Sequence, residues 1–185
     1  MPRPSQRDRI VDAFVDHVVT DGPETVTLEA VAVRAGVSKG GLLYHFGSRE
    51  ALLGGLLDRV RELTDADIAV ARERAAAGTE TLAHYYLRTS ADDPASDSAF
   101  FRAMVAVLKL AGTEEAAAAA ARASMTAWHD VLTSEIGDEL VADVVAALGD
   151  GIYLRAIAQQ GPTAITRDWD ATLAVLLPAA TRPAP

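Results

Sequence analysis

Apolar residues recur at spacings of three and four along almost the whole chain, which is the period of an α-helix with one buried face. No segment shows the sustained alternation and the β-branched enrichment that favour a strand. The first predicted helix begins near Ser5, because Ser5-Gln6-Arg7-Asp8 matches a capping box, and it ends at Asp21-Gly22-Pro23. The pattern therefore predicts an all-α fold of about nine helices.

The next predicted helices are short. The second helix starts at Thr27, whose hydroxyl can cap the free amide groups of the first turn, and it ends at Gly36. Ser38 caps a third helix, which runs to about His45. Ser48 then opens a longer fourth helix, whose apolar positions continue for several turns.

Glycine, proline and acidic clusters divide the rest of the chain. These turn signals lie at residues 77–79, 92–97, 111–113, 137–138 and 161–163. About five further helices fit between them. We predict an N-terminal domain over residues 1–50, which includes the start of the fourth helix, and a C-terminal helical domain over residues 51–181. Residues 182–185 are expected to form a loose tail.

Composition narrows the class of protein. The 185 residues contain no cysteine, which excludes disulfides and thiolate zinc sites. The N-terminus has no apolar stretch of the signal-peptide type. No segment approaches the roughly 18 uncharged apolar residues that a membrane span requires. We therefore expect a cytoplasmic protein that has no membrane partner.

The net charge of -9 is unevenly distributed. Residues 1–61 hold eight Lys and Arg against eight Asp and Glu, whereas residues 62–185 hold nine against eighteen. The N-terminal third is therefore neutral, and the rest of the chain carries the whole excess of acid. A neutral segment is compatible with DNA contact on one small face, although it lacks the excess of Lys and Arg that is typical of a nucleic-acid-binding surface.

Residues 27–46 carry the pattern of a helix-turn-helix, in which two short helices are joined by a turn that contains glycine. Val31 and Ala35 face inward from the second helix, and Gly36 permits the turn. Leu42 closes the small core from the third helix. Helices this short are not stable alone, so they must pack on the first and fourth helices.

Two adjacent glycines stand inside the third predicted helix. Gly40 and Gly41 each cost roughly 1 kcal/mol relative to alanine in a helix interior. On a helical wheel both lie beside Tyr44, whereas Leu42 and Phe46 fall on the opposite, buried side. Glycine removes the distance that a side chain imposes, so this face suits close approach by another molecule. The polar groups around it are donors for phosphates or base edges.

The stretch from Thr27 to Leu53, TLEAVAVRAGVSKGGLLYHFGSREALL, resembles the DNA-binding signature of the tetracycline-repressor (TetR) family of bacterial transcription regulators. The resemblance implies a homodimer that binds double-stranded operator DNA and a small-molecule inducer held in the C-terminal domain. Gly47 departs from the pattern, because family members often carry proline there. By this resemblance the DNA contacts are Thr27, Ser38, Lys39, Gly40, Gly41, Tyr44, His45 and Arg49, with Thr27 and Arg49 on phosphates.

The same residues also have a purely structural interpretation. Tyr44 and His45 would then pack between the N-terminal helices and the fourth helix. Arg49 would pair with a nearby acidic side chain. Both interpretations stay open at the level of the sequence.

The C-terminal helices carry aromatic and apolar side chains at irregular positions, and such side chains can hold a ligand between helices. Each of them also fits a core position. The excess of acidic residues favours a cationic inducer, but the sequence does not identify it. The candidate ligand-binding residues are Tyr86, Phe100, Phe101, Met104, Leu108, Trp128, His129 and Tyr153.

The last two predicted helices are more apolar than a peripheral helix pair requires. We predict an isologous dimer in which they form a four-helix bundle with their symmetry mates. The alternative is that they close the core of a monomer. The predicted interface residues are Leu140, Val141, Val144, Val145, Leu148, Ile152, Trp169, Leu173, Leu176 and Leu177.

Other classes of function have weaker support. The chain has no His-Glu-x-x-His and no phosphate-cradling glycine loop, so we predict no catalytic residues, no metal and no cofactor. A helical ligand-binding or protein-interaction module without DNA binding is the alternative, but it leaves the glycine face unexplained. The favoured function is a repressor that binds a palindromic operator as a dimer and is released by a small molecule.

Overall fold

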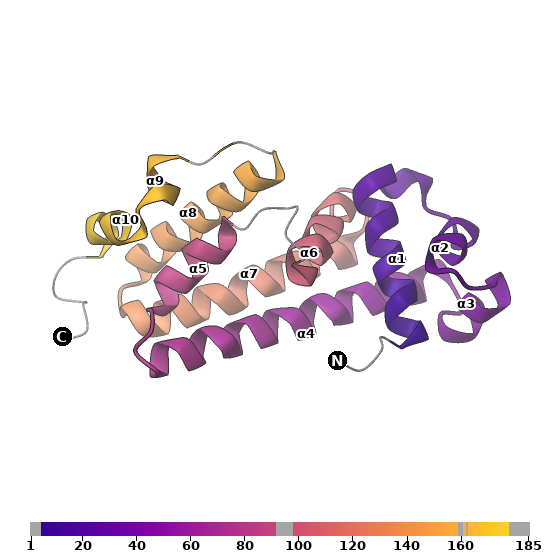
Figure 1. The fold of residues 1–185 in the computed structure, drawn as a ribbon, viewed down its shortest axis with the longest axis horizontal. Helices are drawn as coiled ribbons and strands as arrows, with labels where there is room; N and C mark the ends of the chain where they lie inside the picture. The colour runs from indigo at the N-terminus through magenta and orange to yellow at the C-terminus, as the bar shows by residue number, and fades with distance from the viewer. Residues whose placement is uncertain (1–4, 92–97, 159–160, 162, 178–185) are drawn as a thin grey trace. The chain divides into compact units, whose positions relative to one another are not determined.

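The computed structural model describes residues 5–91, 98–158, 161 and 163–177. Within these residues all regular secondary structure is helical and no strand occurs, so the predicted all-α class is confirmed (Figure 1). The helices are α1 (Gln6–Asp21), the 3-10 helix η1 (Pro23–Thr25), α2 (Leu28–Ala35), α3 (Lys39–His45), α4 (Arg49–Ala76), α5 (Leu82–Ser90), α6 (Ala99–Leu110), α7 (Glu115–Ile136), α8 (Glu139–Ile157), α9 (Ala164–Arg167) and α10 (Trp169–Leu176).

The helices form two compact units that interleave along the chain. Unit 1 contains the described residues up to Leu63 together with Ser98–Ser124. Unit 2 contains the described residues between Thr64 and Asp97 and those from Met125 onward. Because α4 and α7 each begin in unit 1 and end in unit 2, neither unit is one continuous stretch of sequence.

α1 begins at the predicted capping box. The Ser5 hydroxyl accepts a hydrogen bond from the Asp8 N–H at 3.1 Å, and the Asp8 carboxylate accepts one from the Ser5 N–H at 3.1 Å. The capping prediction is therefore confirmed. Ile10, Phe14 and Val18 follow at spacings of four and are fully buried, as expected for one face of a helix.

Unit 1 joins the N-terminal helices to α6, which packs against α1. Two polar contacts reinforce this packing. The Lys109 ammonium donates to the Val19 carbonyl at 2.8 Å, and the Arg102 guanidinium forms an ion pair with the Asp16 carboxylate. Unit 1 therefore includes a helix that lies within the predicted C-terminal domain.

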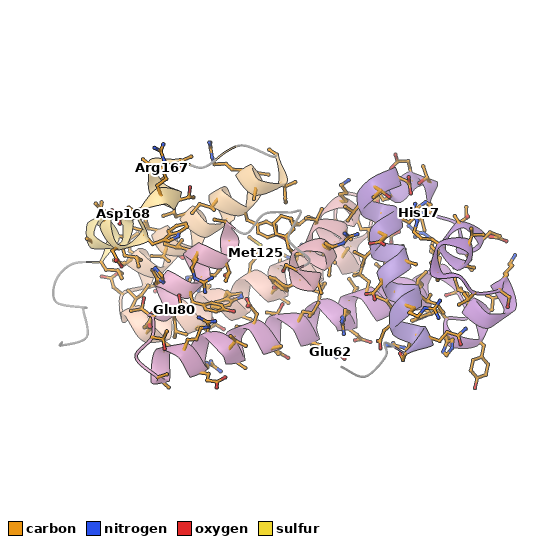
Figure 2. The ribbon with its side chains drawn as sticks, viewed as in Figure 1. His17, Glu62, Glu80, Met125, Arg167 and Asp168 are labelled. Carbon is orange, nitrogen blue, oxygen red and sulfur yellow. The ribbon has the colours of Figure 1, made fainter. Side chains whose placement is uncertain are left out.

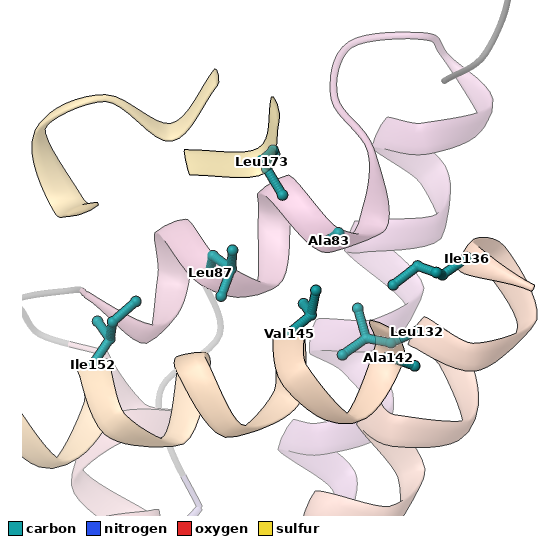
Figure 3. Packing of buried hydrophobic residues seen from close by; sticks show 8 residues of the cluster. All are labelled: Ala83, Leu87, Leu132, Ile136, Ala142, Val145, Ile152 and Leu173. Carbon is teal, nitrogen blue, oxygen red and sulfur yellow. The ribbon is translucent and has the colours of Figure 1, made fainter. Parts of the chain in front are cut away.

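In unit 2, α5 packs against α8 and α10. The Glu135 carboxylate of α7 accepts from the Leu82 N–H at 2.8 Å and from the Ala83 N–H at 3.0 Å. These amide groups open α5 and have no acceptor within their own helix, so Glu135 satisfies them. The apolar core beside them is formed by Ala83, Leu87, Leu132, Ile136, Ala142, Val145, Ile152 and Leu173 (Figure 3).

The last predicted helix is divided in two at Asp168, which is labelled in Figure 2. Asp168 has an extended backbone, with φ -144° and ψ 93°, and it separates α9 from α10. Its carboxylate accepts from the Ala171 N–H at 2.9 Å. Asp168 is thus an N-cap, and a new helix begins where the apolar pattern indicated a continuous one.

The predicted turns at residues 77–79, 111–113 and 137–138 all fall between helices, as expected. The predicted acidic loop at 92–97 and the predicted tail at 182–185 lie outside the described residues. Among the residues that are described, no helix combines the length and the apolar character needed to cross a membrane.

Candidate functional site

A tight turn at Gly36 joins α2 to α3. Gly36 has φ 66° and ψ 37°, a left-handed conformation that glycine adopts without steric cost, and its N–H donates to the carbonyl groups at the end of α2. The Arg9 guanidinium of α1 donates to the Ala35 carbonyl at 2.8 Å. Val31 and Leu42 are fully buried between the two helices. The predicted helix-turn-helix is confirmed.

The two sides of α3 differ as the helical wheel predicts. Leu42 and Phe46 are buried, whereas Tyr44 is 86% exposed. The Tyr44 ring lies edge-on to the ring of His45, with 5.2 Å between centroids, and His45 is half-buried. The exposed side of α3 therefore presents one aromatic phenol that makes little contact with the rest of the chain.

The two glycines of α3 are not equivalent. A Cβ atom at Gly40 would meet no atom closer than Ser38 Oγ, at 3.9 Å. At Gly41 a Cβ would lie 3.3 Å from the same oxygen and 3.5 Å from Gln6 Nε2. Packing within the chain therefore restricts position 41 slightly and does not explain glycine at position 40.

Hydroxyl groups cap three helices around this face. Thr27, Ser38 and Ser48 precede α2, α3 and α4, and each hydroxyl accepts from the N–H three residues later, at 3.1, 3.0 and 3.1 Å. The other amide groups of each first turn have no intrahelical acceptor. Such amides can donate to phosphate oxygens.

Lys39, the first residue of α3, forms an ion pair with Glu29 in the first turn of α2. Both side chains are more than half exposed. The hydrogen bond from Lys39 lowers the pKa of Glu29, so the carboxylate is ionised at neutral pH. The sequence alone does not predict that Glu29 pairs with Lys39. An acidic residue in the first turn of a helix is usually explained by its favourable interaction with the helix dipole.

Arg49 reaches Glu114, which lies directly before α7. The guanidinium Nη1 is 2.5 Å from Glu114 Oε1, and the side chains are 36% and 27% exposed. Both residues belong to unit 1. The interpretation that Arg49 pairs with an acidic side chain is therefore confirmed in the free protein, while its contact with phosphate stays a prediction.

Comparison with known proteins supports this assignment of the helix-turn-helix. Residues 10–56 match the profile of the bacterial regulatory proteins of the tetR family. Over 168 residues, 86% of the chain, the sequence is 28% identical to the HTH-type transcriptional regulator BetI from Cronobacter sakazakii and covers 83% of it. Residues 10–56 therefore carry the DNA-binding domain of the TetR family. Both matches are to transcriptional regulators, not to enzymes.

Solved structures share this fold at low sequence identity. The multidrug binding protein EbrR complexed with malachite green has a TM-score of 0.68 at 22% identity, over 95% of this chain and 100% of that chain. A transcriptional regulator from Rhodococcus sp. Rha1 has a TM-score of 0.64 at 23% identity, over 94% of each chain. At these identities the likeness establishes the fold alone.

The predicted ligand-binding residues are divided between the two units. On α6 of unit 1, Phe101 and Met104 are buried and Leu108 is 41% exposed, so these three do not share one environment. Phe100, also on α6, is half-buried. The unit 2 candidates are Tyr86, Trp128, His129 and Tyr153.

Trp128 is the centre of an aromatic cluster in unit 2. Its ring lies 5.1 Å from the ring of Tyr86 and 6.1 Å from that of Tyr85, measured between centroids. The sequence patterns miss Tyr85, although it adjoins Tyr86 and its hydroxyl donates to Asp67 at 2.6 Å. His129 points to a different partner, because its Nε2 lies 2.8 Å from Asp143 Oδ1.

The Tyr86 side chain passes over α8. Its hydroxyl lies 3.3 Å from Asp150 Oδ1, and a Cβ atom at Gly149 would lie only 2.3 Å from the ring. Partial burial raises the pKa of Asp150, and the hydrogen bond from Tyr86 offsets part of this effect. Burial also raises the pKa of the Tyr153 hydroxyl on the same helix. Unit 2 thus brings aromatic rings and one partly desolvated carboxylate together.

The predicted dimer residues also separate into groups. Val145, Ile152 and Leu173 are buried in the core of unit 2. Leu140 and Val144 are 72% and 45% exposed. The remaining five are partly buried and pack against that core, namely Val141, Leu148, Trp169, Leu176 and Leu177.

The acidic and histidine side chains form no evident metal centre. Among the described residues, no three or more His, Asp or Glu side chains are grouped so that they could hold a metal ion.

Proposed function

We propose that this TetR-family regulator binds a near-palindromic operator in cytoplasmic DNA as a homodimer and represses transcription there. The observation that carries the proposal is the face of α3, on which Tyr44 is 86% exposed and Gly40 leaves the backbone open. A recognition helix lies in the major groove with its N-terminal residues at base edges. Ser38, Lys39 and the two glycines take that position, and Tyr44 and His45 follow along the groove.

Phosphate contacts fix the register of the complex. Thr27 lies at the N-terminus of α2 and Arg49 at the N-terminus of α4, where free amide groups and a guanidinium can bind phosphate oxygens. Because two recognition helices must reach successive major grooves, they are expected to lie about 34 to 36 Å apart in the dimer.

An exposed apolar stripe on α8 supports the dimer. Its residues recur at spacings of three and four, and monomers rarely leave such a contiguous face in water. On α10, Val175 is 86% exposed and adds to the apolar surface of unit 2. The exposed residues of the stripe are Leu140, Val144, Ala147, Gly151 and Leu154.

We further propose that unit 2 binds an aromatic cation that releases the protein from DNA. The rings of Tyr86 and Trp128 and the Asp150 carboxylate supply the faces and the charge that such a ligand prefers. EbrR was crystallised with malachite green and with ethidium, both of which are aromatic cations. The ligand can lower DNA affinity only to the extent that it prefers a dimer whose α3 helices are wrongly spaced.

The DNA proposal is tested by selecting duplexes from a random-sequence library and measuring affinity by gel shift. Tyr44→Ala and Lys39→Ala should each weaken binding at least about fivefold, because one direct contact per subunit is lost. Arg122→Ala is the matched control, since it removes an exposed cation that pairs with Glu115 elsewhere in unit 1. If the chain selects no duplex, the proposed DNA binding fails. If Tyr44→Ala and Lys39→Ala both bind as wild type, the assigned DNA face is wrong.

The ligand proposal is tested by calorimetric titration of the DNA-free protein with malachite green. Asp150→Asn should weaken binding by about fivefold or more, because it removes the charge opposite the cation. Asp130→Asn, an exposed acid on α7, is the control for overall charge. Equal affinities of wild type and Asp150→Asn contradict the cation site.

A further inference from the structure

We infer, on the basis of the proposed function, that Glu114 is a positioning residue for DNA binding: it holds Arg49 in an ion pair that a DNA phosphate must displace. The two side chains meet at 2.5 Å although they are remote in sequence. Glu114 lies outside the helix-turn-helix, in the connection between α6 and α7. Whether Arg49 is available to bind a DNA phosphate therefore depends on Glu114, a residue outside the helix-turn-helix.

Arg49 occupies a place from which it can reach either partner. It is the first residue of α4 and follows the helix-turn-helix directly. The Ser48 hydroxyl accepts from the Ala51 N–H at 3.1 Å, which fixes the start of the helix while the long arginine side chain can still rotate. With 36% of this side chain exposed, the guanidinium remains accessible to an approaching anion.

The backbone of Glu114 is fixed by three hydrogen bonds. Its N–H donates to the Leu110 carbonyl at 2.9 Å, and its own carbonyl accepts from the N–H groups of Ala117 and Ala118 at 3.0 and 3.1 Å. These bonds fix the backbone of Glu114 between the end of α6 and the first turn of α7. If the guanidinium turns to DNA, the carboxylate can therefore follow it only as far as the Glu114 side chain reaches.

The connection that carries Glu114 is also attached to α1 within unit 1. Lys109, near the end of α6, donates to the Val19 carbonyl at 2.8 Å, and Arg102 pairs with Asp16. These contacts keep the end of α6 beside the helices that carry the DNA face. The Arg49–Glu114 pair is therefore part of the packed unit rather than a chance meeting of two surface side chains.

Competition follows from charge and geometry. A carboxylate and a phosphate bind the same N–H groups of a guanidinium, so each contact made with Glu114 is one fewer for DNA. The carboxylate also places a negative charge near the incoming phosphate. Exposed ion pairs change an equilibrium constant by up to about fivefold. Removal of the carboxylate charge should therefore strengthen DNA binding by about two- to fivefold per subunit.

The experiment is a double-mutant cycle of Glu114→Gln and Arg49→Gln, with fluorescence anisotropy on a labelled duplex that the wild-type protein selects from a random library. Glu114→Gln should bind about two- to fivefold more tightly per subunit. Arg49→Gln should bind more weakly, with a logarithmic salt slope shallower by about 0.9 per subunit for the lost phosphate contact. The double variant should bind no more tightly than Arg49→Gln.

The neighbouring Glu115→Gln is the matched control. It removes the same charge one residue further along, from a side chain that is 83% exposed and pairs with Arg122, and it should leave affinity unchanged. Thermal unfolding of each variant is measured as well. If Glu114 has a purely structural role, Glu114→Gln should lower stability without strengthening DNA binding.

The outcomes separate the inference from the proposed function. If the wild-type protein selects no duplex, the proposed function itself fails. If it does, unchanged or weaker binding by Glu114→Gln overturns the inference alone. A gain that persists in the absence of Arg49 also overturns it, because the effect is then one of overall charge.

Discussion

At the scale of single residues, the Glu80 carboxylate of unit 2, labelled in Figure 2, contacts two guanidinium groups and one imidazole. Its side chain is 7% exposed, with His84 Nδ1 at 2.8 Å and the guanidinium groups of Arg74 and Arg88 at 3.1 Å. Burial alone raises the pKa of Glu80, but the hydrogen bonds from Arg88 and His84 outweigh it, and the pKa lies below the ordinary 4.5. The carboxylate is therefore ionised at neutral pH.

Replacement of Glu80 should make stability less dependent on pH. Because the pKa is lower in the folded state, ionised Glu80 stabilises the fold above its unfolded pKa, and this contribution is lost as the pH falls through the folded value. Glu80→Gln should lower the free energy of unfolding by about 1–3 kcal/mol at neutral pH, with a smaller loss below about pH 4. Urea unfolding followed by circular dichroism measures both values. Glu73→Gln, an exposed acid on α4, is the control, and an equal loss at both pH values contradicts the assignment.

The glycines of α3 lead to a second prediction for single residues. Gly40→Ala should raise the free energy of unfolding by roughly 1 kcal/mol, because its Cβ meets open space in a helix. Gly41→Ala should gain less, since its Cβ presses on Ser38 Oγ, the atom that caps α3. Both substitutions should weaken DNA binding if the backbone approaches the groove. Urea unfolding measures the stability of each variant, and gel shifts measure its affinity for DNA. If Gly40→Ala is more stable and binds DNA as tightly as wild type, glycine at position 40 is merely tolerated.

At the scale of helices, α4 packs closely against Phe46, the residue that follows α3. A Cβ atom at Gly55 would lie 2.6 Å from Phe46 Cε1 and 3.4 Å from Val11 Cγ2, whereas at Gly54 nothing lies within 4 Å. Phe46 is 2% exposed, so its ring has little space into which it can move. Packing against Phe46 therefore requires glycine at position 55, whereas packing places no such restriction on position 54.

These adjacent positions form a matched pair. Gly55→Ala should lower the free energy of unfolding by about 1–3 kcal/mol, because the methyl group overpacks the contact with Phe46. Gly54→Ala should raise it by up to about 1 kcal/mol through helix propensity alone. Chemical unfolding of the two variants measures the difference. Similar effects of the two substitutions would mean that helix propensity, rather than the fit to Phe46, determines both positions.

Features that depend on a few neighbouring residues are predictable from the sequence. The Ser5 and Ser38 caps and the turn at Gly36 belong to this group, as does the division of α3 into a buried and an exposed side. The fit of Gly55 to Phe46 and the pairing of Arg49 with Glu114 are not predictable, because they join segments whose proximity depends on the whole fold. Asp168 is an intermediate case, since its capping signal lies inside a segment whose apolar period continues.

At the scale of the whole molecule, periodicity predicts the helical class but not the partner of each apolar face. α8 is apolar on two sides, one buried in the core of unit 2 and one exposed. A helix that is apolar nearly all round gives no period from which core and interface can be separated. The predicted dimer residues therefore include Val145 and Ile152, which are buried in unit 2, and omit Leu154, which is 66% exposed.

Leu154 accordingly provides the test of the proposed dimer. Leu154→Glu should convert the dimer to monomers, because a charge on the exposed stripe cannot be buried against its symmetry mate. Light scattering after size-exclusion chromatography should show half the mass of the wild-type protein. Circular dichroism should show unchanged helicity, since the Leu154 side chain adds little to the core of unit 2.

Affinity for the selected duplex should fall at least about tenfold in Leu154→Glu, because each half-site is then bound without the effective concentration that a linked second site supplies. Val70→Glu on α4 is the control, since Val70 is also exposed in unit 2 and lies outside the stripe. If Leu154→Glu remains dimeric, another surface joins the subunits. If it is monomeric but binds DNA as tightly as wild type, dimerisation is not what brings two recognition helices to one operator.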